Sequence, residues 1–443
     1  MRSTLRATVR LTAGLIVAMW WAAPAGAAPG DLDGSFSGDG WVRTQEVRTE
    51  TNNFLPKGAE DLAIQPDGKI LAVGELQDGS SYWYFGVFRY LPDGELDPGF
   101  GDGGWVATDL GSFPFAHAVA LQPDGKIVMA GEGDCHLAGC FVLVRYNEDG
   151  SLDTSFGEGG VVRTMFGQFG SLALDVAIRS DGKIVAAGLR FRGADAQDDE
   201  RFAVARYLPD GQLDRSFSGD GRVSLDLGYG DDIARAVAVL PRGKILVAGQ
   251  GTKNRGLTED DFAVVRLRRD GTPDPTFSGD GVSLINFGAS RFDIPYSLDV
   301  QQDGRILVAG SSVDERDADP RVAIARLDPD GSLDGGFGNG GLLRFRAGPY
   351  GGYAAAVLQH PDGRILVAGR RFVDGQHDAS DWVVLRHRAG GSLDPSFGEG
   401  GMIVTDFGTG AERAGAMAVQ TDGRIVVGGL LYGSLGLARY LAV

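Results

Sequence analysis

A unit of about 60 residues recurs seven times along this sequence, and that period restricts the possible folds more than any other feature. The step Asp-Gly-Lys/Arg-Ile marks it most clearly, because its glycines recur every 57 to 61 residues. These glycines are Gly68, Gly125, Gly182, Gly243, Gly304, Gly363 and Gly423. The fourth copy lacks the aspartate and reads Pro241-Arg242-Gly243-Lys244. A second marker, Leu-Asp-x-x-Phe (with Pro273 for the leucine once), ends at Phe36, Phe100, Phe156, Phe217, Phe277, Phe337 and Phe397.

Each unit contains four short apolar runs of strand length. In the second copy, residues 118–160 and their flanks, the runs are HAVAL, KIVMAG, FVLVRY and GVVRTMF. They are rich in Val, Ile and aromatic residues, clusters of Gly, Asp and Pro separate them, and no run keeps a helical period. Pro-Asp-Gly joins the first two runs as a tight turn. The unit is therefore predicted to be a four-stranded antiparallel sheet.

The two ends of the repeat array complement each other. The sequence starts within the tail of a unit, with the fourth-strand run Trp41–Thr44, and it stops after a third-strand run at 436–440. Pairing these two runs would close a ring and remove two exposed strand edges. The sequence thus predicts an all-β fold, a seven-bladed β-propeller of four-stranded blades whose N-terminal strand closes the last blade.

These markers together resemble the delta-sixty repeat family of bacterial proteins, which are predicted propellers without an assigned molecular function. The resemblance covers residues 32–440. At lower resolution, AVAVQPDG-type segments followed by KILVAG are similar to the first two strands of NHL-type blades. The resemblance implies the fold and supplies no activity.

Residues 1–27 are typical of a secretory signal peptide, so residues 28–443 are predicted to be a single exported domain. Arg2, Arg6 and Arg10 precede an apolar core, and Ala25-Gly26-Ala27 fits a cleavage site. Removing this segment changes the net charge from −17 to −20, which disfavours nucleic acid and anionic membranes as partners. We expect a monomer without a membrane span, located in the periplasm, at the cell surface or outside the cell.

The two cysteines, Cys135 and Cys140, fall in one loop between second and third strands. In an exported chain we expect them to form a local disulfide. The alternative is half of a metal site, but no second pair of cysteines exists and His136 alone would not complete it.

An arginine and an aspartate eight residues later occur in every unit, and we expect each such pair to be an ion pair that supports the fold. The arginines are Arg89, Arg145, Arg206, Arg266, Arg326, Arg386 and Arg439. Their partners are Asp97, Asp153, Asp214, Asp274, Asp334, Asp394 and, across the closure, Asp33. Calcium binding by the aspartates is the alternative, although the spacing lacks the ligand order of a calcium loop.

One face of the ring should carry recognition, because its loops differ between units. These loops span 75–83, 132–139, 189–200, 251–261, 311–320 and 370–381. The mouth of the central channel on this face should be lined where the innermost strands begin. The predicted lining is Glu60, Asp61, His117, Asp175, Asp232, Arg235 and Tyr296, with Asp231, Asp293, Glu412 and Arg413 nearby. A solvated rim without a ligand is the alternative.

No catalytic residues are assigned, since GxSxG, HExxH, P-loop and dinucleotide motifs are absent and the five histidines occupy different repeat positions. We interpret the protein as a secreted or surface-associated binding scaffold for a carbohydrate, peptide or protein. The alternatives are a propeller hydrolase or lyase, lactonase-like, with a cation such as calcium at the channel mouth, and a purely structural envelope protein.

Overall fold

The computed structural model describes residues 28–49, 52–112, 114–135, 138–193, 200–228, 230–251, 260–288, 290–314, 318–408 and 410–442. The predicted export segment 1–27 and His136 lie outside these residues. Within them, no helix has the length and apolar character that a membrane crossing requires.

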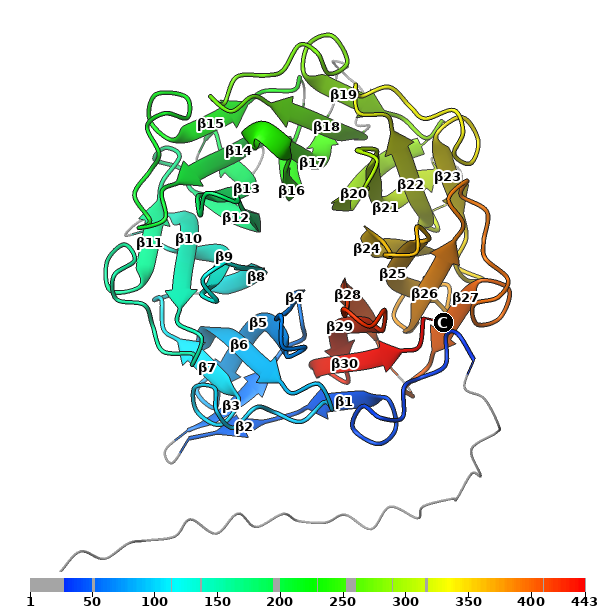
Figure 1. The fold of residues 1–443 in the computed structure, drawn as a ribbon, viewed down its shortest axis with the longest axis horizontal. Helices are drawn as coiled ribbons and strands as arrows, with labels where there is room; N and C mark the ends of the chain where they lie inside the picture. Colours follow the sequence, from blue (N-terminus) through cyan, green and yellow to red (C-terminus); the bar gives the residue numbers. More distant parts are fainter. Residues whose placement is uncertain are drawn as a thin grey trace, which may run out of the picture.

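Seven antiparallel sheets stand around a central axis as the blades of a propeller, which confirms the predicted fold (Figure 1). Blade one is β4 (Asp61–Ile64), β5 (Ile70–Asp78), β6 (Trp83–Tyr90) and β7 (Trp105–Thr108). Blade two is β8 (Phe115–Leu121), β9 (Ile127–Asp134), β10 (Gly139–Tyr146) and β11 (Val161–Thr164). Blade three is β12 (Ser171–Ile178), β13 (Ile184–Phe191), β14 (Glu200–Tyr207) and β15 (Arg222–Leu225). Blade four is β16 (Ile233–Val239), β17 (Ile245–Gly251), β18 (Asp261–Leu267) and β19 (Val282–Ile285). Blade five is β20 (Ser290–Val300), β21 (Ile306–Asp314), β22 (Arg321–Leu327) and β23 (Leu342–Phe345). Blade six is β24 (Gly352–Gln359), β25 (Ile365–Phe372), β26 (Ser380–His387) and β27 (Met402–Thr405). Blade seven is β28 (Arg413–Val419), β29 (Ile425–Leu431), β30 (Ser434–Tyr440) and β1 (Trp41–Thr44).

The ring is closed by β1, the first strand in the chain. It pairs antiparallel with β30, so that Trp41 lies opposite Ala438 and Thr44 opposite Leu435. The seventh blade therefore takes three strands from the C-terminal end of the repeat array and one from its N-terminal end, as predicted.

Two elements differ from the regular pattern. A hairpin of β2 (Val47–Arg48) and β3 (Asn53–Pro56) adds to β5, so the first blade's sheet has six strands in place of the predicted four. In the fourth copy the turn is a 3-10 helix, Pro241–Gly243, in which Arg242 takes a φ of 63°. The glycine of this turn, Gly243, keeps the left-handed φ of 79° that the other copies show, for example Gly125 at 83°. Arg242 is thus an additional left-handed residue in the fourth copy.

Apolar side chains fill the spaces between neighbouring blades. The second and third strands are almost fully buried; β30, for instance, is buried at every position. At the closure, Phe36, Leu435 and Leu437 pack in one cluster with Phe88 and Tyr90 of the first blade. Each blade thus depends on its neighbours, as expected for a propeller.

The seven arginine–aspartate pairs are present and buried. In each, the arginine Nε lies 2.7 to 2.9 Å from the aspartate Oδ2. The arginine also stacks on the Leu-Asp-x-x-Phe ring at 4.3 to 4.8 Å from the ring centroid. Its Nη1 donates to a backbone carbonyl of the next blade, as Arg89 does to Glu148 and Arg439 to Pro92. Each pair therefore connects two blades.

A second cation reaches every one of these aspartates, which we did not expect. It is the lysine or arginine of the Asp-Gly-Lys/Arg step, 2.6 to 3.4 Å from the carboxylate. These cations are Lys69, Lys126, Lys183, Lys244, Arg305, Arg364 and Arg424. The charged residues that recur in every unit thus form ion pairs with one another.

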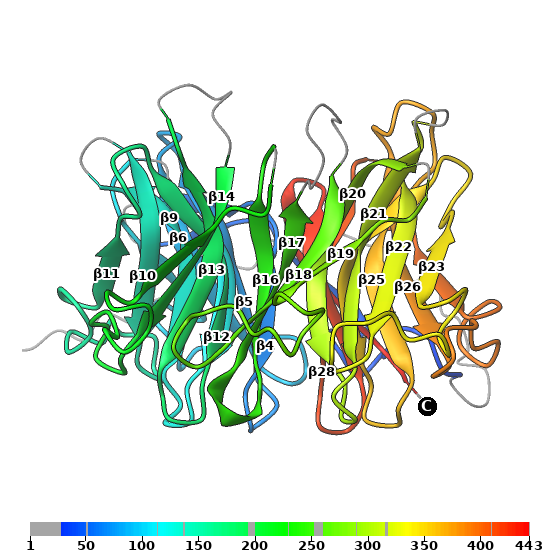
Figure 2. The same cartoon turned by 90° about the horizontal axis from the view of Figure 1, so that it is seen from above.

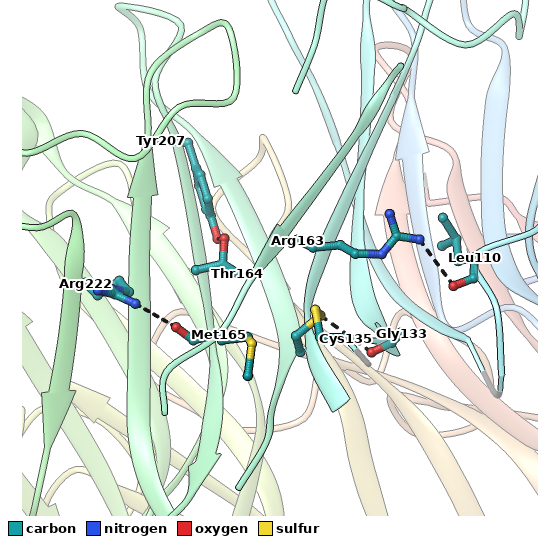
Figure 3. Close-up of a disulfide and its surroundings, with 9 residues drawn as sticks. Leu110, Gly133, Cys135, Arg163, Thr164, Met165, Tyr207 and Arg222 are labelled. Carbon is teal, nitrogen blue, oxygen red and sulfur yellow. Dashed lines mark hydrogen bonds between the residues drawn. A yellow bond between two sulfur atoms is a disulfide. The ribbon is translucent and has the colours of Figure 1, made fainter. Parts of the chain in front are cut away.

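The disulfide between Cys135 and Cys140 is present and links the end of β9 to β10 (Figure 3). Cys140 is fully buried. Figure 2 shows the molecule from the side, with the second-to-third strand loops gathered at one end of the ring and the Asp-Gly turns at the other. The disulfide lies at the loop end.

Candidate functional site

The innermost strands of the seven blades enclose a cavity of about 320 Å³ in the channel, which their middle residues line for the most part. Six of the seven predicted residues line it: Glu60, Asp61, His117, Asp175, Arg235 and Tyr296. They come from the first five blades, so residues far apart in the sequence meet at this point.

A β-bulge occurs at the same position of six innermost strands, and the residue that each bulge adds lines this cavity. The pairing of β8 with β9 skips His117, for example, and that of β16 with β17 skips Arg235. The six bulge residues are His117, Leu174, Arg235, Tyr296, Ala355 and Gly415, and all line the cavity. In the first blade Glu60 precedes β4 at the equivalent position. Bulges commonly re-aim side chains at binding sites, and here they build one ring, which we call the bulge ring.

Two arginines and two tyrosines form a continuous stack across blades four to six. The Arg235 guanidinium lies 5.5 Å from the Tyr296 ring centroid, and the Tyr296 and Tyr353 centroids are 5.4 Å apart. Arg370 lies 4.7 Å from the Tyr353 centroid, which it faces across the β24–β25 pair. We call Arg235, Tyr296, Tyr353 and Arg370 the Arg–Tyr arc. Arg235 and Tyr296 line the cavity, and Tyr353 and Arg370 continue the stack beside it.

The opposite half of the mouth is acidic. Glu60 forms an ion pair of 2.5 Å with Arg413, which joins blades one and seven. Burial, followed by the charge of Glu60, raises the pKa of Glu75 to about 7, and burial also raises the pKa of Glu132. Burial lowers the pKa of His117 to about 4, so its imidazole is neutral at pH 7. The raised pKa values of Glu75 and Glu132 reduce the negative charge of this half, while both side chains still provide hydrogen-bonding groups.

Asp61 and Asp175 combine a channel position with a role in the scaffold. Asp61 accepts hydrogen bonds of 2.8 Å from Leu62 N and from Val119 N of the next blade. Asp175 accepts equivalent bonds from Val176 N and from Val237 N of the next blade, at 2.7 and 2.6 Å. Burial raises the pKa of Asp61 to about 7 and, with the charge of Asp61, that of Asp175 to about 8.

With these raised pKa values, Asp61 and Asp175 contribute less stability as pH rises from about 4 to 8, because the folded state holds protons that the unfolded carboxyls have lost. Each such group changes the free energy of unfolding by at most about 1.4 kcal/mol per pH unit. Ser297 accepts the equivalent inter-blade bond, from Val357 N, in the fifth blade. Asp175→Ser should therefore fold and should flatten the dependence of melting temperature on pH between 5.5 and 8. An unchanged slope would contradict the role given to Asp175.

Asp232 does not line the mouth, and this part of the prediction is wrong. Asp232 comes directly before β16 and is fully buried against the third blade, where its Oδ2 lies 3.6 Å from Nη1 of Arg201. Asp232 accepts a hydrogen bond of 2.8 Å from Leu227 N in the link between blades. Asp293 and Glu412 hold the equivalent links, through Phe287 N and Phe407 N. Asp231 is exposed beside them.

A cation site has little support in this geometry. Among the described residues, no group of three or more His, Cys, Asp or Glu side chains is placed to hold a metal ion. The invariant aspartates, considered above for calcium, are each occupied by two cationic side chains.

The sequence prediction did not place Tyr353, Arg370, Glu75 or Glu132 at the channel mouth, although the last three begin predicted recognition loops. Glu75, Glu132 and Arg370 directly follow the glycine of the second strand, a position that an alignment of the seven units would have identified. Tyr353 lies opposite Arg370 in the strand pair. The residues after the second-strand glycine therefore mark the site in the sequence, but the prediction considered positions on the first strand only.

A model of the family described as "Domain of unknown function (DUF5122) beta-propeller" matches residues 65–100, 122–156, 179–217, 241–277, 301–337 and 360–397. Each match runs from an Asp-Gly turn region to the Phe of Leu-Asp-x-x-Phe, and together they cover half of the chain. A search of curated proteins gave no match to this sequence.

Several solved structures are similar in overall shape. Polysaccharide lyase Uly1 is 11% identical, with 87% of this chain and 90% of that chain covered and a TM-score of 0.49. Sqt1 from Chaetomium thermophilum is 13% identical, with coverage of 88% and 97% and a TM-score of 0.47. A putative oxidoreductase (glucose dehydrogenase) from Thermus thermophilus is 17% identical, with coverage of 73% and 96% and a TM-score of 0.42. Likeness at this level extends no further than the propeller shape.

Proposed function

We infer a function from the geometry of the channel mouth of this chain. The chain belongs to the β-propeller family described as domain of unknown function (DUF5122). The protein is proposed to be an extracytoplasmic scaffold that binds a carbohydrate in the cavity of about 320 Å³. The observation that carries the proposal is the Tyr296–Tyr353 ring pair beside a ring of polar side chains.

A sugar ring matches these two kinds of surface. Its C–H face is apolar and packs on an aromatic ring, while its hydroxyl groups need several donors and acceptors at fixed positions. Tyr296 supplies the aromatic surface, and Glu60, Arg235 and Ser297 supply polar groups around it. Pockets with an apolar wall and a few convergent polar groups are the usual form of a small-molecule site.

The volume favours a small ligand over a folded protein partner, since about 320 Å³ lies at the lower end of ligand pockets. A peptide side chain is the other occupant of similar size. The location outside the cytoplasm is supported by the disulfide and by the export segment expected at residues 1–27. The delta-sixty resemblance stays a prediction.

A hydrolase or lyase activity at the same site is the second candidate. Glu75, with a pKa raised to about 7, lies near Glu60, which is ion-paired with Arg413. Two carboxyl groups in different environments are the usual requirement for acid–base work on a glycosidic bond. This candidate shares the carbohydrate ligand and differs only in whether the bound ligand is cleaved.

The proposal is tested by titrating neutral and acidic oligosaccharides into the purified protein and into Tyr296→Ala. We expect one saccharide class to bind, and Tyr296→Ala to bind it about tenfold more weakly, because the loss of stacking surface costs about 1.4 kcal/mol or more. Tyr350→Ala, at a 40% exposed tyrosine in a link between blades, is the control and should bind normally. Failure of every saccharide to bind, or unchanged binding by Tyr296→Ala, would contradict the proposal. Chromatography of the titrated saccharide reports any cleavage.

A further inference from the structure

Arg370 stands out at the mouth because the scaffold does not use its charge. Among the described residues it has no ion pair and no hydrogen-bond partner for its side chain, and its Nε is buried without a partner. Its guanidinium is held between two rings, 4.7 Å from the Tyr353 centroid and 4.5 Å from that of Phe372. A partly buried guanidinium without an anion is costly unless a ligand supplies one.

The other blades show that the propeller does not require an arginine at this position. The equivalent residues, each following the second-strand glycine, are Glu75, Glu132, Leu189, Gln250, Ser311 and Leu430. The bulge position of Arg235 is equally variable, with Glu60, His117, Leu174, Tyr296, Ala355 and Gly415 in the other blades. Comparison of the seven units thus distinguishes Arg370 and Arg235, which each occur in one unit, from the arginines that occur in every unit and support the fold.

Arg235 closes the other end of the arc and keeps part of its hydrogen-bonding capacity free. Its Nε and Nη2 share one acceptor, the Gln250 Oε1, at 3.3 and 3.0 Å, and no carboxylate of the described residues lies within ion-pair distance of it. Arg413, the third arginine of the mouth, is instead neutralised by Glu60. Two arginines without ion pairs therefore flank two tyrosines, in a chain that carries an excess of negative charge.

We propose that the ligand of the mouth is an acidic sugar, whose ring packs on the tyrosines of the Arg–Tyr arc and whose carboxylate binds Arg370 or Arg235. The planar guanidinium donates two parallel hydrogen bonds to a carboxylate, and its stacking on Tyr353 fixes the plane in which it does so. The acidic half of the mouth, with Glu75 and Glu132, is left for the hydroxyl groups. This inference rests on the proposed carbohydrate binding and specifies its chemical class.

The test compares acidic saccharides with uncharged copies of the same shape by isothermal titration at low ionic strength. The probes are trigalacturonate, trimannuronate and sialyllactose, each beside its carboxyl methyl ester. We expect at least one acid to bind and its ester to bind at least tenfold more weakly. Arg370→Gln should lose at least tenfold in affinity for the acid and little for the ester. It should also fold, because Gln250 occupies the equivalent position in the fourth blade. Arg388→Gln, at a 59% exposed arginine outside the mouth, should bind as the unmodified chain does.

The outcomes separate this inference from the proposed function. Equal affinity for acid and ester, or an Arg370→Gln variant that binds the acid normally, would overturn the acidic-sugar assignment and leave carbohydrate binding standing. Binding of neutral oligosaccharides alone would do the same. Failure of every saccharide, acidic or neutral, would overturn both.

Discussion

Removing residues 28–44 is expected to lower the free energy of unfolding by about 5 kcal/mol or more, the largest effect predicted for any change in this protein. The deletion takes away β1, exposes the edge of β30, removes the fully buried Phe36 and leaves Arg439 without Asp33. Thermal and urea unfolding of the shortened chain would measure the loss. The shortened chain should also aggregate, since an open strand edge pairs with other molecules.

A synthetic peptide of residues 28–49 provides the control for this deletion. It should bind the shortened chain and restore its melting temperature, because β1 pairs with β30 through four consecutive residues. A scrambled peptide should have no effect. Unchanged stability of the shortened chain would show that the ring does not depend on this strand.

Asp33→Ala is expected to cost about 3–5 kcal/mol, the usual effect of removing one partner from a buried ion pair. Asp33 is 6% exposed and holds Arg439 Nε at 2.8 Å and Arg424 Nε at 2.7 Å. Its loss leaves the buried Arg439 without a carboxylate, while Arg424 keeps its ion pair with Asp422. It also accepts hydrogen bonds from the Ser35 amide and hydroxyl. Chemical denaturation would measure the change.

Two aspartates serve as matched controls for Asp33→Ala. Asp39, which lies in the same segment and is exposed, should tolerate alanine within about 0.5 kcal/mol. Asp153 makes the same contacts within the second blade, so Asp153→Ala should cost as much as Asp33→Ala. An Asp33→Ala variant as stable as Asp39→Ala would contradict the ring-closing role of the pair.

The fold could be predicted because the repeat fixes strand number, and the truncated units at its two ends point to the pairing of β1 with β30. The arginine–aspartate register followed from the constant spacing of eight residues. The added hairpin β2–β3 could not be predicted in this way, because the link that contains it, between Thr44 and Asp61, is longer than the equivalent links of the other units.

Less of the candidate site than of the fold could be predicted from the sequence, because the site depends on the bulges of the innermost strands. A bulge shifts which side chains face the channel, and no residue type marks it here: His117, Tyr296 and Gly415 occupy the same place. The prediction for Asp232 was wrong because this residue, just before β16, is buried against the third blade. Arg370 and Tyr353 join the site through the pairing of two strands, which counting along one strand does not reveal.

The position of a bound acidic oligosaccharide tests the central claim most directly. A crystal structure of the protein with the tightest-binding acid of the panel should show electron density for the ligand in the channel mouth. A sugar ring should lie against Tyr296, and a carboxylate should lie within hydrogen-bonding distance of the Arg370 or Arg235 guanidinium. Density for the ligand on the outer loops, with the mouth empty at saturating concentration, would contradict the account.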